Sequence, residues 1–224
     1  MHYPITALAV AISLATGTPL SAEVVEQDRS GFVTKDEAVV SATPKEVWLA
    51  LITPASWWNA AHTWSGDSAN LTLRPQAGGC FCEKIPEAEE ENRITLEGSV
   101  EHMRVVQSYP ESALRMTGGL GPLQSEAVNG VLTIAISEVD EGTRIVWEYH
   151  VSGRMRYEMD VISKAVDGVM TQQLDGLAAM LGRVDDGGEP EPEPEPEAEE
   201  APEAAPSDGD APSVDDAFGD LSDG

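Results

Sequence analysis

Glu83, His62 and His102 are the side chains in this sequence that could carry acid–base chemistry. Glu83 and Phe81 alternate along a predicted strand, so their side chains point to the same face. If Phe81 faces an apolar cavity, Glu83 faces it too, and burial would raise the pKa of its carboxyl and make it a general base. A histidine titrates near neutral pH and could act as acid or base in the same cavity. The alternatives are ordinary ones: an exposed glutamate on a strand, and His62 as a loop residue capping a short helix.

Cys80 and Cys82 are the two cysteines of the chain, and their spacing on a strand places both thiols on one side, with Phe81 opposite. A disulfide between them would be a reducible redox site in an oxidising compartment. Extended backbone, however, holds their Cα atoms about 6.5–7 Å apart, at the limit for a disulfide, so we expect two packed thiols. As zinc ligands the pair is incomplete even with His102, because zinc takes four ligands. We therefore expect no metal and no cofactor.

Three tryptophans, Trp57, Trp58 and Trp64, crowd one predicted loop region. Indoles gathered in a loop are expected to cover something apolar, either the mouth of a cavity or a second small core. The sequence contains no Gly-x-Ser-x-Gly elbow, phosphate-binding loop, dinucleotide-binding glycine pattern or His-Glu-x-x-His. These observations disfavour a hydrolase, kinase or dehydrogenase.

The elements that must position these side chains follow from the spacing of apolar residues. Thr43-Pro44-Lys45-Glu46 predicts the start of a short helix, with Thr43 as N-cap and Glu46 three residues later. A second short helical turn follows through Trp57 and Trp58. Short connections rich in turn-forming residues favour antiparallel neighbours for the strands. Seven strands are predicted, over 31–42, 70–75, 79–85, 94–109, 113–120, 128–139 and 143–152.

One long helix is predicted over 156–182, where apolar residues recur at helical spacing. At ~1.5 Å per residue it would be roughly 39 Å long, enough to lie across a whole sheet. Gly168 and Gly176 lie within this helix, and each destabilises it by about 1 kcal/mol relative to alanine. We interpret them as points of close packing or bending.

The order of one strand, two short helices, six strands and a long helix resembles the helix-grip fold of the START-like (SRPBCC) superfamily. That superfamily includes lipid-transfer domains, polyketide cyclases and homologues of the heat-shock ATPase activator. The resemblance covers 29–184 and implies an α+β fold, in which a seven-stranded curved antiparallel sheet, with two short helices after strand 1, wraps around the C-terminal helix. It fixes a fold and a cavity rather than a reaction. The segment 43–48 looks like the family's helix entry after the first strand, and Trp57-Trp58, 62–67, 78–83 and 119–124 are similar to a bacterial subgroup.

The resemblance also implies a pocket between the sheet and the long helix, because their apolar faces meet imperfectly in this superfamily. Methionine on both walls suits a pocket that must adapt to its ligand. A filled core is the alternative. The expected lining is Phe81, Met116, Leu120, Trp147, Tyr149, Met159 and Ile162, with Trp57, Trp58 and Trp64 closing the mouth.

The expected function is a binding or carrier protein for a hydrophobic small molecule or lipid. The alternative is a cyclase- or lyase-like enzyme that uses Glu83, His62 or His102 as acid–base groups. A protein-interaction domain is a third interpretation, which export would disfavour because the usual partner of such relatives is cytosolic.

Residues 1–22 have the layout of a secretory signal peptide: a short apolar run, a break at Gly17-Thr18-Pro19, and Leu20-Ser21-Ala22 before the cleavage point. The absence of Lys and Arg before the apolar run departs from that layout. We expect cleavage after Ala22 and a periplasmic or secreted protein. N-terminal sequencing of the protein from its native host should give Glu23, and an intact Met1 in the cytosolic fraction would contradict export.

Residues 185–224 form an acidic tail with sixteen Asp and Glu and no Lys, Arg or His, within a chain of net charge −27. Alternating Glu-Pro favours an extended, disordered segment. Phe218 and Leu221 could dock weakly on a protein partner. Basic residues do not cluster anywhere, which argues against nucleic-acid binding. No further stretch is long and apolar enough to predict stable membrane insertion after processing.

Overall fold

The computed structural model describes residues 23–184 except 88, 91–92 and 95. The predicted signal peptide and acidic tail lie outside these residues. The chain forms two units, Met1–Gly188 and Glu189–Gly224, and the helices and strands given below lie in the first.

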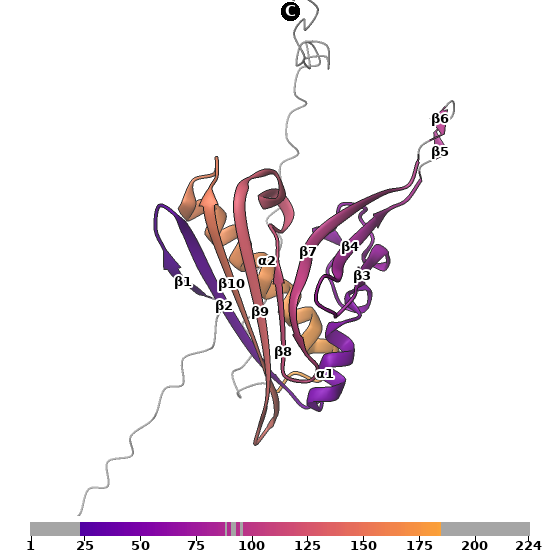
Figure 1. Ribbon diagram of the computed structural model, residues 1–224. Helices are drawn as coiled ribbons and strands as arrows, with labels where there is room; N and C mark the ends of the chain where they lie inside the picture. The colour runs from indigo at the N-terminus through magenta and orange to yellow at the C-terminus, as the bar shows by residue number, and fades with distance from the viewer. Residues whose placement is uncertain (1–22, 88, 91–92, 95, 185–224) are drawn as a thin grey trace, which may run out of the picture. The chain divides into compact units, whose positions relative to one another are not determined.

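The main sheet has eight antiparallel strands in the order β1-β2-β10-β9-β8-β7-β4-β3, and α2 packs on one of its faces (Figure 1). A separate pair of two-residue strands, β5 and β6, lies between β4 and β7 in the sequence. The strands are β1 Glu23–Gln27, β2 Gly31–Val40, β3 Leu71–Leu73, β4 Cys80–Ile85, β5 Glu89–Glu90, β6 Arg93–Ile94, β7 Gly98–Tyr109, β8 Ala113–Thr117, β9 Ala127–Val139 and β10 Gly142–Arg154.

Two α-helices accompany the sheet, α1 Pro44–Leu51 and α2 Met159–Met180. The predicted helix start is confirmed: the Glu46 N–H donates to the Thr43 hydroxyl (3.3 Å), and the Thr43 N–H donates to the Glu46 carboxylate (2.8 Å). This capping box satisfies two backbone donors at the helix end. Four short 3-10 helices are η1 Pro54–Ser56, η2 Ala60–His62, η3 Ser68–Asn70 and η4 Gly121–Ser125.

The expectation of a curved antiparallel sheet with a long C-terminal helix is confirmed, but the sheet has eight strands rather than seven. The additional strand is β1, which pairs with β2 at the edge. Its sequence, EVVEQ, is short, and three of its five residues are acidic or amide, so no local pattern predicts it. The predicted strand 94–109 also proves to be β7 together with the end of the small β5–β6 pair.

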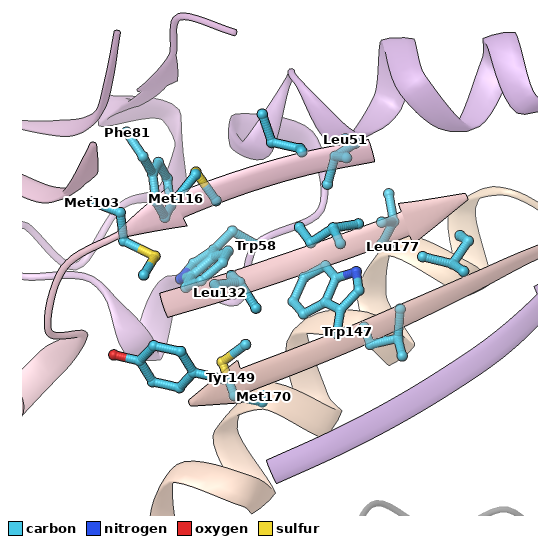
Figure 2. Packing of buried hydrophobic residues seen from close by; sticks show 14 of the residues in the cluster. Leu51, Trp58, Phe81, Met103, Met116, Leu132, Trp147, Tyr149, Met170 and Leu177 are labelled. Carbon is cyan, nitrogen blue, oxygen red and sulfur yellow. The ribbon is translucent and has the colours of Figure 1, made fainter. Parts of the chain in front are cut away.

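The core lies between the sheet and α2, with Trp147 and Tyr149 of β10 at its centre (Figure 2). Leu174 and Leu177 of α2 are fully buried on the opposite side. Their spacing and that of the other buried residues of α2 match a single helical face. The apolar faces of the sheet and of α2 therefore meet directly along the second half of the helix.

The two glycines of α2 have different surroundings, which yields a prediction. A Cβ at Gly176 would lie 2.6 Å from the backbone oxygen of Trp57, whereas a Cβ at Gly168 would meet nothing within 4 Å. Close packing is thus confirmed at Gly176 alone. We expect Gly168→Ala to raise the free energy of unfolding by about 1 kcal/mol through helix propensity, and Gly176→Ala to lower it. Urea unfolding of the two variants checks this, and equal shifts of the same sign would contradict it.

Candidate functional site

A pocket of about 330 Å³ opens between the first half of α2 and two loops of the domain. Its α2 wall has residues three and four apart, the spacing of one helical face. Its volume is at the lower end of the range for small-molecule sites. The lining residues are Trp58, Ala61, His62, Thr63, Trp64, His102, Leu120, Gly121, Pro122, Ile162, Ala165, Val166, Val169 and Met170.

His102 reaches the pocket because of an irregularity in β7. Phe81 of β4 pairs with Met103, but Cys82 pairs with Glu101, so His102 is an extra residue in the ladder. A bulge of this kind disturbs the alternation of side chains along a strand. As a result His102 and Met103, although consecutive, are both buried.

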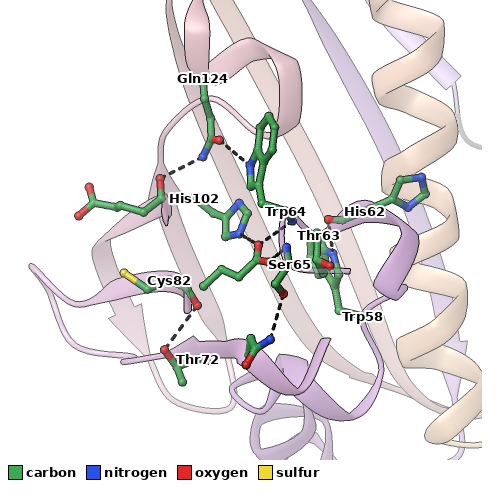
Figure 3. Close-up of polar contacts among 12 residues, drawn as sticks. Trp58, His62, Thr63, Trp64, Ser65, Thr72, Cys82, His102 and Gln124 are labelled. Atoms are coloured by element: carbon green, nitrogen blue, oxygen red, sulfur yellow. Dashed lines mark hydrogen bonds and ion pairs between the residues drawn. The ribbon is translucent and has the colours of Figure 1, made fainter. Parts of the chain in front are cut away.

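Glu83 is held by three donors and is 1% exposed. Its carboxylate accepts hydrogen bonds from the backbone N–H of Trp64 (3.0 Å) and of Ser65, and it lies 2.8 Å from Nε2 of His102 (Figure 3). Because two of the donors are backbone groups, the carboxylate is fixed in position and ties the loop before β3 to the sheet.

The electrostatics of Glu83 differ from our expectation of a raised pKa. Burial alone would raise the pKa of the carboxyl, but hydrogen bonds from Ser65, Trp64 and His102 outweigh burial and lower it. For His102, burial lowers the pKa of the ring, and the hydrogen bond and charge of Glu83 oppose this effect only in part. At neutral pH the pair is therefore a carboxylate beside a neutral imidazole. Glu83 is suited to orient His102 rather than to act as a base itself.

The tautomer of His102 follows from this charge state. A carboxylate only accepts hydrogen bonds, so we assign the ring proton to Nε2, which donates to Glu83. The other nitrogen, Nδ1, then carries a lone pair. His102 packs its ring beside Phe81, with centroids 5.1 Å apart.

His62 is fixed from α2 rather than from the sheet. Gln173, a fully buried residue, accepts from the Asn59 N–H through Oε1 (2.8 Å), so its amide nitrogen faces Nδ1 of His62 at 2.9 Å. The His62 carbonyl also accepts from the indole N–H of Trp58 (3.1 Å). His62 is the last residue of η2, and it lines the pocket as well.

The three loop tryptophans have separate positions. Trp58 is buried and lines the pocket, whereas Trp64 lines it while remaining 58% exposed. The Trp64 indole N–H donates to the side chain of Gln124 (2.9 Å) next to the pocket (Figure 3). Trp57 packs against Trp147 with centroids 5.9 Å apart and donates to the Ala50 carbonyl, outside the pocket lining.

The pocket brings together part of the predicted set: Trp58, Trp64, Leu120 and Ile162, with His62 and His102. The other predicted lining residues lie elsewhere because the centre of the sheet–helix interface is filled, and the pocket forms only where the loops separate from α2. The α2 lining residues that the sequence analysis does not predict are Ala165, Val166, Val169 and Met170. They follow Ile162 at helical spacing, which is visible in the sequence. Phe81, Met116, Trp147 and Tyr149 belong to the buried core, and Met159 lies at a separate surface hollow with Met155 and Tyr157.

Tyr149 does not line the pocket, but it holds one of the loops that do. Its hydroxyl donates to the Gly118 carbonyl (2.9 Å) and accepts from the Leu120 N–H (3.1 Å). Burial raises the pKa of Tyr149 well above its ordinary value, so the hydroxyl stays neutral and keeps both bonds. Tyr149 thus positions the loop that carries Leu120 and Pro122 into the lining.

Cys80 and Cys82 form a disulfide, so the expectation of packed thiols is wrong. Their Cα atoms are 5.3 Å apart, less than extended backbone gives and within the range that a disulfide requires. The strand is irregular here, since its register with β7 shifts between Phe81 and Cys82. As expected, both sulfurs lie opposite the buried Phe81, on the face of the sheet away from the pocket.

Within the residues that the structure describes, no group of three or more His, Cys, Asp or Glu side chains could hold a metal ion. The helices of the described part are also too short or too polar to cross a membrane.

Comparison with known proteins identifies one family. Residues 32–182 match the family model described as polyketide cyclase/dehydrase and lipid transport. None of the curated proteins compared with the chain matches it.

Several solved structures are similar at low identity. Protein MLL2253 of Mesorhizobium loti is 18% identical, with a TM-score of 0.46 over 66% of this chain and 96% of that one. A protein from Rhizobium leguminosarum is also 18% identical, with a TM-score of 0.49 over 72% and 96%. CalU16 of Micromonospora echinospora is 15% identical, with a TM-score of 0.42 over 74% and 83%. Likenesses this distant carry no information on the ligand or the reaction.

Proposed function

The chain belongs to the polyketide cyclase/dehydrase and lipid transport family, and from this premise we propose that it binds and carries a hydrophobic small molecule in the pocket beside α2. The observation that supports the proposal most is the α2 wall, where Ile162, Val166 and Val169 present apolar side chains to a hollow at the edge of the core. Apolar surface lining an open pocket is stabilised when a ligand removes it from water.

Export is part of this proposal and is supported by the layout of residues 1–22. Cleavage after Ala22 would leave β1, which begins at Glu23, complete.

A tryptophan placed in the pocket wall tests the binding site directly. Val169→Trp adds an indole to the lining, and we expect it to weaken binding of the neutral dye N-phenyl-1-naphthylamine by at least about tenfold. Fluorescence titration of the purified protein measures the dissociation constant.

The matched control is Val161→Trp on the same helix, where the valine is 64% exposed and outside the pocket. It should keep the wild-type dissociation constant within about twofold. No saturable dye binding to the wild type, or equal affinities of the two variants, would refute the proposed site.

The Glu83–His102 pair supports a second candidate, an acid–base enzyme of the cyclase or lyase kind. A histidine oriented by a buried carboxylate at the wall of a pocket has the arrangement of a general base. Native mass spectrometry of the protein with its co-purified ligand separates the two candidates. A carrier returns the ligand with unchanged mass and chromatographic retention after prolonged incubation, whereas a cyclase or lyase converts it to an isomer of different retention or to a product of lower mass by loss of water or another group.

A further inference from the structure

The polar side-chain atoms around the pocket are mostly used within the protein. The Trp58 indole donates to the His62 carbonyl, and the Thr63 hydroxyl donates to the Ala60 carbonyl (2.7 Å). The Trp64 indole donates to Gln124. None of these groups needs a ligand to complete its hydrogen bonding.

The two histidines of the lining each have one ring nitrogen without a partner in the described part of the chain: in His62 it is Nε2, because Nδ1 faces the Gln173 amide, and in His102 it is Nδ1. Nε2 of His102 is engaged by Glu83. The residue is 6% exposed and lines the pocket, and Nδ1 is not sealed from solvent. Nδ1 is therefore the ring nitrogen of His102 that remains for a ligand. Because Glu83 fixes the proton on Nε2, the atom presented to a ligand is an acceptor.

The charge of the lining narrows the ligand further. Among the residues that the structure describes, no Lys or Arg lines the pocket to pair with an anion. The ionised Glu83 stands directly behind His102 and would repel a carboxylate or phosphate in the pocket. A lone-pair acceptor also offers nothing to an anionic oxygen. The site thus disfavours fatty acids and phosphorylated headgroups.

We propose that the pocket takes an uncharged apolar molecule bearing a hydroxyl group, an alcohol or a phenol, whose O–H donates to Nδ1 of His102. The proposal rests on the proposed binding function and specifies its ligand class. Glu83 is the positioning residue: it holds the tautomer that makes Nδ1 an acceptor. An analogue without the O–H would leave a buried acceptor without a partner, which costs affinity.

Three naphthalene probes of similar size test the ligand class on the full-length protein. We expect 2-naphthol to bind at least about tenfold more tightly than 2-methoxynaphthalene or 2-naphthoate at pH 7. The methyl ether keeps the apolar body but cannot donate, and the naphthoate replaces the donor by a charge. In His102→Phe, which retains an aromatic ring beside Phe81, the preference for 2-naphthol over 2-methoxynaphthalene should vanish.

The outcomes separate the two proposals. Equal binding of all three probes by the wild type would overturn the hydroxyl proposal alone. Absence of saturable binding for all three would overturn the binding function and this proposal together.

A measurement on the wild type guards against a variant that does not fold. Two-dimensional ¹⁵N–¹H spectra of the histidine rings should show the His102 proton on Nε2 and an unprotonated Nδ1 at pH 7. A proton on Nδ1 would overturn the proposal, since the pocket would then face a donor.

Discussion

Glu83→Ala should lower the free energy of unfolding by about 3–5 kcal/mol, because it leaves three buried donors without an acceptor at about 1–3 kcal/mol each. The carboxylate accepts hydrogen bonds from the backbone N–H groups of Trp64 and Ser65 and from the ring of His102. Alanine would leave these donors buried without an acceptor, and each unsatisfied group is destabilising. Urea unfolding followed by tryptophan fluorescence measures the loss.

Glu101→Ala is the matched control. Glu101 lies next to His102 on β7, but its side chain is 45% exposed and pairs with Arg104 at the surface. Exposed pairs of this kind contribute about 0–1 kcal/mol, so Glu101→Ala should be nearly neutral. If Glu83→Ala were as mild as the control, the carboxylate would not anchor the loop.

The same pair predicts how stability depends on pH. The pKa values of Glu83 and His102 are both lowered in the folded state, so the unfolded chain binds more protons and stability rises with pH. The contribution of each group is complete above its ordinary pKa, 6.5 for His102 and 4.5 for Glu83. It is lost as pH falls through the lower, folded value. The difference in the free energy of unfolding between wild type and Glu83→Ala should therefore become smaller as pH falls below 4.5.

The sequence predicts this site only in part, because alternation along a strand cannot show a bulge. Regular alternation would place His102 on the face of β7 opposite to Met103. The extra residue in β7 turns both inward, and this alone brings His102 to Glu83. The sequence makes both residues candidate acid–base groups, and His102 also a possible third ligand beside Cys80 and Cys82, but nothing in it pairs Glu83 with His102. Their partnership depends on register, which is a property of two strands rather than one.

Elements with strong local signals were predicted well. The capping box at Thr43 and the apolar periodicity of α2 depend on residues within a few positions of each other. β1 has no such signal and forms because β2 offers it an edge. Similarly, apolar periodicity predicts which residues face inward but not whether they meet a core or a hollow.

Met116→Ala tests whether the centre of the sheet faces a filled core or a ligand pocket. Met116 of β8 is 3% exposed and pairs with Val105 of β7 and Leu132 of β9, within the cluster shown in Figure 2. The sequence placed it in the pocket lining, where truncation would change ligand affinity more than stability. In the filled core that the structure has, truncation leaves a cavity that costs about 2–5 kcal/mol.

The expected result for Met116→Ala is thus a large loss in the free energy of unfolding, with the dissociation constant for N-phenyl-1-naphthylamine unchanged within about twofold. Met180→Ala, at a methionine that is 47% exposed at the end of α2, is the matched control and should cost less than about 1 kcal/mol. Urea unfolding and dye titration on the same preparations give both quantities. A small stability loss combined with altered dye affinity would contradict this result. It would mean that the ligand pocket extends past Trp58 to the middle of the sheet, because only a side chain that lines the pocket can be truncated with little loss of stability and still change binding.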